Sequence, residues 1–247
     1  SNNETRFKNS SLIPFNADRK NDLHSLLSLA KQEGKINSII IDDLSTNEIT
    51  RISKIWRELG GKVIDSKTST GSQNEKLISE LLGIEDSRLR SRKLARVLSV
   101  PLETIPRRRL DIDSIILSVS ISRARSLKPA LEYNFGESIS VYLLSNWINN
   151  ETYLKKEIDL EGITVIDMPW VLNASVNELS EKKNTRSRSF AIGYDMFELI
   201  LLLNNNANQR SFQYTGMSGK ISFNQGKLNR KSIKARIEES NYRALGY

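Results

Sequence analysis

The side chains that could do chemistry are few, and their types exclude most classes of enzyme. The 247-residue sequence contains no cysteine and one histidine, His24. Cysteine nucleophiles, disulfides, thiolate zinc sites and iron–sulfur clusters are therefore excluded. A Ser/His/Asp triad would have to use His24, which lies in a helical pattern and is interpreted as a partly exposed helix residue. No Gly-rich phosphate loop occurs. We expect no catalysis, no cofactor and no metal.

Polar and aromatic side chains follow several of the predicted strands. Ser118, Ser145 and Asp167 lie at strand ends, and Trp147 and Trp170 come shortly after two of those strands. The carboxyl ends of parallel strands meet at one edge of a sheet, where α/β folds bind ligands. We expect these five residues to line a cleft, although ordinary packing would explain both tryptophans equally well.

Other polar residues near strand ends have simpler interpretations. Asp42 and Asp43 follow a predicted strand, and we interpret them as a turn and helix entry rather than a ligand site. Ser120 is a further candidate for the cleft. No pair of carboxylates has a spacing that identifies a general acid and base.

Positive charge is concentrated in two stretches. The net charge is +8, and residues 86–109 and 208–247 each carry eight basic and two acidic residues, or +6 apiece, leaving 8 − 12 = −4 elsewhere. Arg88, Arg92 and Arg96 recur every four residues and form one helical stripe. The triplet of residues 107–109 is Arg107, Arg108 and Arg109, just before a strand. These arginines are either solvated surface or docking groups for an acidic partner, and the triplet could also anchor a carboxylate or phosphate.

Nucleic acid is not expected as a partner. The basic stretches lack interleaved aromatic residues, and no nucleic-acid-binding motif is present.

The elements that must position these residues alternate along the chain. Apolar runs predict strands near residues 36–41, 62–65, 113–120, 140–144 and 162–166, and amphipathic patterns predict helices between them. This β-α-β alternation predicts a parallel sheet with helices on both faces, in a Rossmann-like lobe over about residues 16–145.

Three further elements carry definite expectations. A helix starting near Asp86 contains Leu89, Leu94, Val97 and Leu98, which we expect to pack. Residues 190–203 are apolar nearly all round, so that helix is expected to be deeply buried. Residues 219–223 and 228–237 predict a closing hairpin.

Several motifs occur together in one order. They are IPRRRLDID at 105–113, ARSLKP at 124–129, VYLLS at 141–145, DLEG at 159–162, DMPW at 167–170, FAIGYD at 190–195 and GMSGKISF at 216–223, followed by Arg230. The joint pattern closely resembles the C-terminal module of the LpoA (also called LppC) penicillin-binding-protein activators. The match is dense over 105–170 and 190–230 and weaker over 12–65.

This resemblance implies a fold and an organisation. The fold is α/β and type 1 periplasmic-binding-protein-like, with two Rossmann-like lobes built on parallel sheets, the first lobe incomplete. Residues 1–15 would be a remnant of the first lobe, 16–165 the second lobe, 166–215 a return segment of the first lobe, and 216–247 a hairpin returning to the second.

The resemblance also implies a function. It is that of a non-enzymatic periplasmic regulator that binds and activates a class A penicillin-binding protein, a peptidoglycan synthase, with peptidoglycan as a further candidate partner. The protein would be held at the outer membrane only by a lipid anchor upstream of this chain. The alternative is a periplasmic receptor that binds an amino acid or cell-wall fragment in the cleft.

Overall fold

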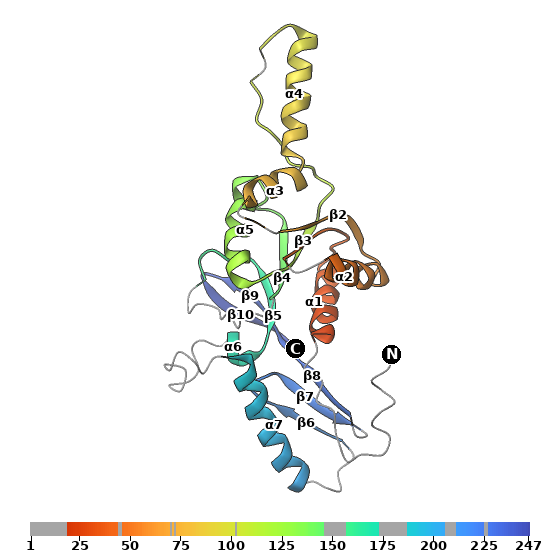
Figure 1. The fold of residues 1–247 in the computed structure, drawn as a ribbon, viewed down its shortest axis with the longest axis vertical. Helices are drawn as coiled ribbons and strands as arrows, with labels where there is room; N and C mark the ends of the chain where they lie inside the picture. Colours follow the sequence, from red (N-terminus) through yellow and green to blue (C-terminus); the bar gives the residue numbers. More distant parts are fainter. Residues whose placement is uncertain are drawn as a thin grey trace.

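The computed structural model describes most of the chain. The described residues are 19–43, 46–69, 71, 73–101, 103–145, 157–172, 187–205, 211–224 and 227–247. They form one large sheet in the order β10-β9-β5-β4-β3-β1-β2 and a three-stranded sheet in the order β6-β7-β8. Figure 1 shows an elongated molecule, with α4 projecting at one end and α7 at the other.

The large sheet contains the parallel strands that the alternation predicts. Apolar runs without polar interruptions form its centre, as expected of strands covered on both faces. Five neighbouring strands are parallel, and two antiparallel strands extend the sheet beyond β5. The parallel strands are β1 (Asn37–Asp42), β2 (Lys62–Thr68), β3 (Ser114–Ser118), β4 (Ser140–Leu144) and β5 (Thr164–Asp167), and the antiparallel ones are β9 (Ile233–Glu238) and β10 (Asn241–Gly246).

Helices cover both faces of this sheet. Alternate residues of a strand point to opposite faces, so Ile40 and Ile116 pack with α1 (Lys20–Gln32) and α2 (Thr46–Glu58). Their neighbours Ile39 and Ile115 pack with α3 (Asn74–Leu81) and α5 (Ile121–Tyr133). The prediction of a three-layer Rossmann-like lobe is confirmed.

The helix α4 (Ile84–Leu98) corrects one expectation. Leu89, Leu94, Val97 and Leu98 were expected to pack, but they are 48%, 55%, 81% and 56% exposed. The reason is that α4 leaves the lobe just beyond α3, and the chain returns beside it in an irregular segment (Figure 1). One helix and one returning segment are too thin to enclose these side chains.

A smaller unit lies at the other end of the molecule. Its elements are α7 (Arg188–Asn205) and the antiparallel strands β6 (Ser211–Thr215), β7 (Lys220–Asn224) and β8 (Lys227–Lys231), reached from β5 through the short helix α6 (Pro169–Leu172). Strands β7 and β8 pair antiparallel as the predicted hairpin requires, but the predicted second strand of 228–237 is divided, because β8 joins the small sheet and β9 joins the large one.

The deep burial predicted for residues 190–203 is wrong. Helix α7 buries Arg188, Ala191, Asp195 and Leu199 along one side, whereas Phe197 and Ile200 are 60% and 56% exposed. Only one face of the helix packs, against the small sheet and α6.

The lobe boundaries at residues 15, 165 and 215 stay predictions. The remnant expected at 1–15 lies outside the described residues. Among the described helices, none is long and apolar enough to cross a membrane.

Candidate functional site

The carboxyl edge of the large sheet carries a buried polar cluster. Asp167 ends β5, and its carboxylate lies 2.5 Å from the guanidinium of Arg188, the first residue of α7. Ser145 follows β4 and donates from Oγ to the same carboxylate at 2.8 Å. The backbone N–H of Met168 donates to the other carboxylate oxygen at 2.8 Å. The structure therefore brings together Ser145 and Asp167, and it joins them to an arginine that the sequence did not identify.

The side chains of this cluster are buried. The side chains of Arg188 and Asp167 are 4% and 0% exposed, and Ser145 is fully buried. Burying a carboxylate is costly unless it is paired and hydrogen-bonded, and Asp167 has both a cation and hydrogen-bond donors from the chain itself.

A second polar group lies where β1 and β3 end side by side. In this strand order the direction of winding reverses between β1 and β3, which is where such folds bind ligands. Asp43 accepts a hydrogen bond from the backbone N–H of Ser120 at 2.7 Å, and its own N–H donates to the carbonyl of Ser118 at 3.3 Å. Ser120 also caps α5 by accepting from the N–H of Arg123. These contacts agree with the interpretation of Asp43 as part of a turn.

Ser118 and Arg19 complete this edge. Ser118 is fully buried, and its hydroxyl has no hydrogen-bond partner among the described residues. Arg19 donates to the carbonyl of Leu144 at 3.2 Å, and burial lowers its pKa. Ser118 lies one strand away from Ser145 and two strands away from Asp167, because β3 pairs with β4 and β4 with β5.

Of the two tryptophans predicted to line the cleft, the structure describes one. Trp147 lies outside the described residues. Trp170 lies in α6 directly after β5, is 8% exposed and contacts Phe190 of α7, with the ring centroids 5.6 Å apart and the rings tilted by 34°. Its indole therefore packs between the large lobe and the smaller unit. A role for either residue in binding a ligand stays a prediction.

Two further buried carboxylates hold the smaller unit, one by a contact within it and one at its junction with the large lobe. Asp195 of α7 accepts from the backbone N–H groups of Met217 and Ser218 at 2.8 and 2.7 Å. Gly216 precedes them, and a Cβ there would lie 2.2 Å from the Asp195 carboxylate, so only glycine fits. This contact gives a structural role to the GMSG motif.

Asp22 of α1 makes the other attachment. Its carboxylate lies 2.9 Å from the guanidinium of Arg230 in β8, with side chains 3% and 1% exposed. Ser232 also donates to Asp22 at 3.0 Å. Burial raises the pKa of Asp22, and the attraction of Arg230 opposes that rise.

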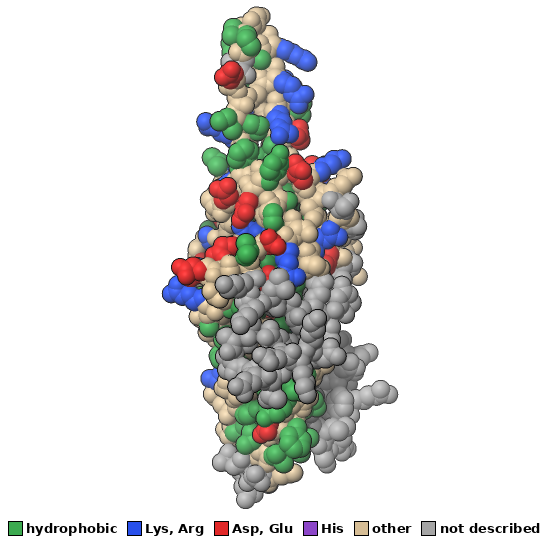
Figure 2. Space-filling view, turned by 90° about the vertical axis from the view of Figure 1, so that its left-hand side faces the viewer, with side chains coloured by type: hydrophobic (Ala, Val, Ile, Leu, Met, Phe, Trp, Pro, Cys, Tyr) green, Lys and Arg blue, Asp and Glu red, His purple; other side chains and the backbone are tan. Residues whose placement is uncertain are grey.

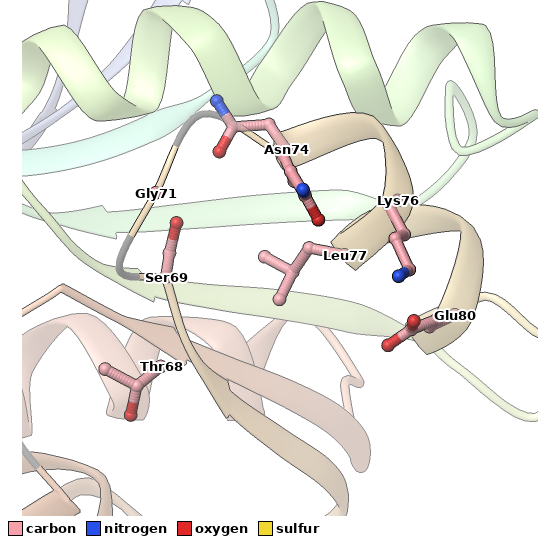
Figure 3. Close-up of a pocket in the computed structure, with 8 residues that line it drawn as sticks. Thr68, Ser69, Gly71, Asn74, Lys76, Leu77 and Glu80 are labelled. Carbon is pink, nitrogen blue, oxygen red and sulfur yellow. The ribbon is translucent and has the colours of Figure 1, made fainter.

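An open pocket lies elsewhere on the same edge of the lobe. It has a volume of about 400 Å³ and lies between the end of β2 and α3 (Figure 3). Arg123 closes one side by donating to the carbonyl of Gly71 and to Asn74. None of the four predicted cleft residues that the structure describes, Ser118, Ser145, Asp167 and Trp170, lines it. The lining residues are Thr68, Ser69, Gly71, Gln73, Asn74, Lys76, Leu77 and Glu80.

The predicted basic residues lie on and beside α4. Arg92 and Arg96 are exposed, and Arg88 is 51% exposed and paired with Glu85 at 2.5 Å. In the triplet, Arg109 makes a two-pronged contact with Asp111 at 2.7 and 2.6 Å.

The other two members of the triplet differ. Arg108 donates to Ser138 at 2.8 Å, whereas Arg107 is exposed and uses its backbone N–H to bond Ser87. Two of the three guanidinium groups are therefore paired within the lobe near the base of α4, and Arg107 remains on the surface with the stripe. Docking by these arginines stays a prediction.

Arg188 is the main site residue that the sequence pattern did not identify. It lies in a polar stretch just before the apolar residues 190–203, and it belongs to none of the quoted motifs. A cation at the start of a helix is unfavourable beside the positive end of the helix dipole, so an arginine there, followed by an apolar helix, is a signal for a buried acidic partner. Arg230 was noted only as part of a motif, and its pairing with Asp22 spans 208 residues.

The described residues contain no cluster of metal-binding side chains. No group of three His, Asp or Glu side chains among them could hold a metal ion. His24 is exposed on α1, and its ring lies 3.3 Å from the hydroxyl of Ser28 in the same helix.

The family model and the similar sequences found by comparison agree on one protein family. A family model described as "LppC putative lipoprotein" matches residues 42–235. A protein of Vibrio antiquarius named penicillin-binding protein activator LpoA is 29% identical over 157 residues, which is 60% of this chain and 26% of that protein. The same-named protein of Aliivibrio fischeri is 27% identical over 162 residues, covering 62% and 27%. The chain thus spans about a quarter of the length of these relatives.

Solved structures show the same fold. Haemophilus influenzae LpoA superposes with a TM-score of 0.58 at 13% identity, over 92% of this chain and 39% of that one. A substrate-binding protein of an ABC transporter from Desulfitobacterium hafniense, solved in complex with Leu, gives a TM-score of 0.52 at 12% identity, over 90% and 64%. The fold is that of type 1 periplasmic binding proteins, as predicted.

Proposed function

We infer the function from the premise that this chain belongs to the LppC lipoprotein family. Relatives in that family carry the name penicillin-binding protein activator LpoA. We propose that the chain is a non-enzymatic module that binds a class A penicillin-binding protein in the periplasm and activates its synthesis of peptidoglycan. Peptidoglycan itself is a further candidate for contact.

The observation that supports this proposal most is that the polar groups around Asp167, at the carboxyl edge of the large sheet, already have partners within the chain. A solute receptor needs convergent polar groups that are available to its ligand. Here the carboxylate of Asp167 is bound by Arg188, Ser145 and a backbone N–H, and all three side chains are buried. Because these polar groups are bound to one another, they are not available to a solute. This supports a role in binding a protein rather than a small molecule.

The absence of a nucleophile motif agrees with the names of the relatives. They are called activators, and the described part of this chain places its one histidine on an exposed helix surface. We therefore propose that the chain acts by binding, and that the bound synthase performs the chemistry.

Anchoring is a separate part of the proposal. Membership of a lipoprotein family supports attachment to a membrane through a lipid on a residue outside these 247 residues. We propose the outer membrane as the site of attachment, with this module facing the periplasm. Fractionation of cells that produce the whole protein would test this, and recovery with the inner membrane would contradict it.

A solute receptor remains the second candidate, because one observation favours it. The hydroxyl of Ser118 is fully buried without a partner among the described residues, at the edge where receptors of this fold take ligands. The D. hafniense protein of the same fold was solved with Leu.

Sedimentation velocity separates the two candidates. The purified chain is mixed with a class A penicillin-binding protein from the same organism, and each protein is also run alone. The proposal expects a faster boundary containing both proteins. Two unchanged boundaries at micromolar concentration would contradict it, whereas a receptor would bind a small solute and leave both boundaries as they were.

A further inference from the structure

The projecting element of residues 84–110, which we call the arm, is attached only at its base. Ile84 and Ser87 are buried, the N–H of Arg107 donates to Ser87 Oγ at 3.0 Å, and the N–H of Arg109 donates to the carbonyl of Leu82 at 2.9 Å. Beyond Ser87, every described residue from 88 to 110 is exposed or half-buried. Figure 1 shows α4 extending away from α3 and the rest of the lobe.

The arm exposes an unusual amount of aliphatic surface. Single apolar side chains on a surface are normal, but a concentration of them marks an interaction site. Val97, Ile105 and Leu110 are 81%, 77% and 85% exposed. With them the arm exposes Leu89, Leu94, Leu98 and Val100, each about half exposed or more.

The arm also carries much of the chain's excess charge. Residues 84–110 contain eight basic residues and three acidic residues, Glu85, Asp86 and Glu103, so their net charge is 8 − 3 = +5. The whole chain has +8, which leaves 8 − 5 = +3 for the remainder. Figure 2 shows Lys and Arg side chains beside apolar ones on the projecting end of the molecule.

The types and placement of these residues favour a protein partner over a membrane. Seven of the eight basic residues are arginine, which is enriched in protein interfaces where lysine is depleted. A helix that lies in a membrane interface has one apolar face, often with aromatic residues. The arm has no aromatic residue, and its aliphatic side chains lie on both the helix and the returning segment.

We propose that the arm docks by insertion into an acidic groove with an apolar floor on a partner protein. Its arginines pair with carboxylates at the rim, and its aliphatic side chains are buried against the floor. This proposal rests on the proposed function, so the partner used in the test is the class A penicillin-binding protein. It assigns the main contact to exposed aliphatic side chains that had been expected to pack within this chain.

The test compares two triple variants of the full chain by surface plasmon resonance on immobilised synthase. In the arm variant, Leu89→Ser, Val97→Ser and Ile105→Ser remove aliphatic surface at the arm. In the control variant, Ile36→Ser, Ile158→Ser and Leu245→Ser remove aliphatic side chains that are 48%, 74% and 38% exposed on the main lobe. Circular dichroism and thermal unfolding of each variant serve as checks that the fold is unchanged.

The proposal expects the arm variant to bind at least about tenfold more weakly than the parent, since truncation at the centre of an interface commonly costs that much or more. The control variant is expected to bind like the parent. Equal binding by all three proteins would overturn the arm proposal and leave the proposed function standing. No binding by the parent would overturn both.

A second experiment uses vesicles of phosphatidylglycerol and phosphatidylethanolamine. The proposal expects the parent and the arm variant to sediment equally little with these vesicles in physiological salt. Strong binding by the parent that the arm variant loses, with no change in its binding to the synthase, would overturn the proposal in favour of a lipid surface.

Discussion

Arg188 at the start of α7 and Asp167 at the end of β5 form a buried ion pair with an N–O distance of 2.5 Å. The pair joins the smaller unit to the large lobe, and it lies at the carboxyl edge of the parallel strands, the edge at which α/β sheets bind ligands. We therefore expect the stability of this junction to depend on these two side chains.

Breaking this pair should destabilise the chain strongly. Asp167→Ala leaves the guanidinium of Arg188 buried without its carboxylate, and such changes typically cost about 3–5 kcal/mol. The double variant Asp167→Leu with Arg188→Met removes both charges, so it should lose less than the single variant. Urea unfolding measures all three proteins. A loss of stability in the double variant that equals or exceeds that of the single variant would show that the pair itself stabilises the fold.

The carboxylate at the base of the arm should confer a small pH dependence. The hydrogen bonds from Arg109 hold the pKa of Asp111 below its usual range. A depressed folded pKa contributes stability that is present above the unfolded pKa of about 3.9 and is lost as the pH falls through the folded value.

The size of that effect is limited by solvent. Both side chains are more than a third exposed, so we expect about 0–1 kcal/mol at most. Chemical unfolding of the parent and of Asp111→Asn at pH 7 and pH 3 measures it. The difference between the two proteins should shrink at pH 3, and a difference that grows on acidification would contradict the assignment.

Charge reversal on the arm should alter the kinetics of partner binding. Arg88→Glu, Arg92→Glu and Arg96→Glu together should slow association with the synthase and flatten its salt dependence, because exposed charges act mainly through steering. The fold should survive, since no side chain of the stripe is buried. Association rates at low and high salt provide the measurement.

A control reverses three exposed basic residues elsewhere on the chain. Lys54→Glu, Arg57→Glu and Lys227→Glu make the same change in net charge away from the arm. We expect a weaker effect from them than from the arm variant. Equal slowing by both variants would show that net charge alone steers the encounter, and unchanged rates in the arm variant would show that the stripe is only solvated surface.

Small solutes should leave the thermal stability unchanged. A ligand that binds only the folded state at a hundred times its Kd would add about 2.7 kcal/mol of stability. Because Asp167 is already bound by Arg188 and Ser145, we expect no rise in Tm with L-leucine, D-alanine or muropeptides. A saturable rise with any of them would favour the receptor function.

The repeating pattern of strands and helices was sufficient to predict the large lobe. Ile39, Ile40 and Ile41 form an uninterrupted apolar run, and all three are fully buried. Such a run is typical of a strand covered on both faces, and the helices between these runs are amphipathic. Local periodicity therefore determined the topology of this part of the chain.

Local periodicity did not predict the exposure of apolar residues that lie outside the core. Leu94 and Val97 have the composition of a packing face, but α4 projects from the lobe, and nothing in the local pattern distinguishes a core contact from a contact with another molecule. The candidate site was predictable only in part for a similar reason. Ser145 and Asp167 followed from their positions at strand ends, whereas Arg188 reaches Asp167 across 21 residues through a tertiary contact.

We propose that this chain activates a peptidoglycan synthase, and the rate at which the synthase cross-links glycan strands is the most direct test. A purified class A penicillin-binding protein is supplied with lipid-linked precursor, and products are followed as the concentration of the chain rises. We expect the rate to increase and saturate with the parent, and the variant with Leu89→Ser, Val97→Ser and Ile105→Ser to need a higher concentration for the same rate. A synthase rate that stays constant at saturating concentrations of the parent chain would show that the chain is not an activator.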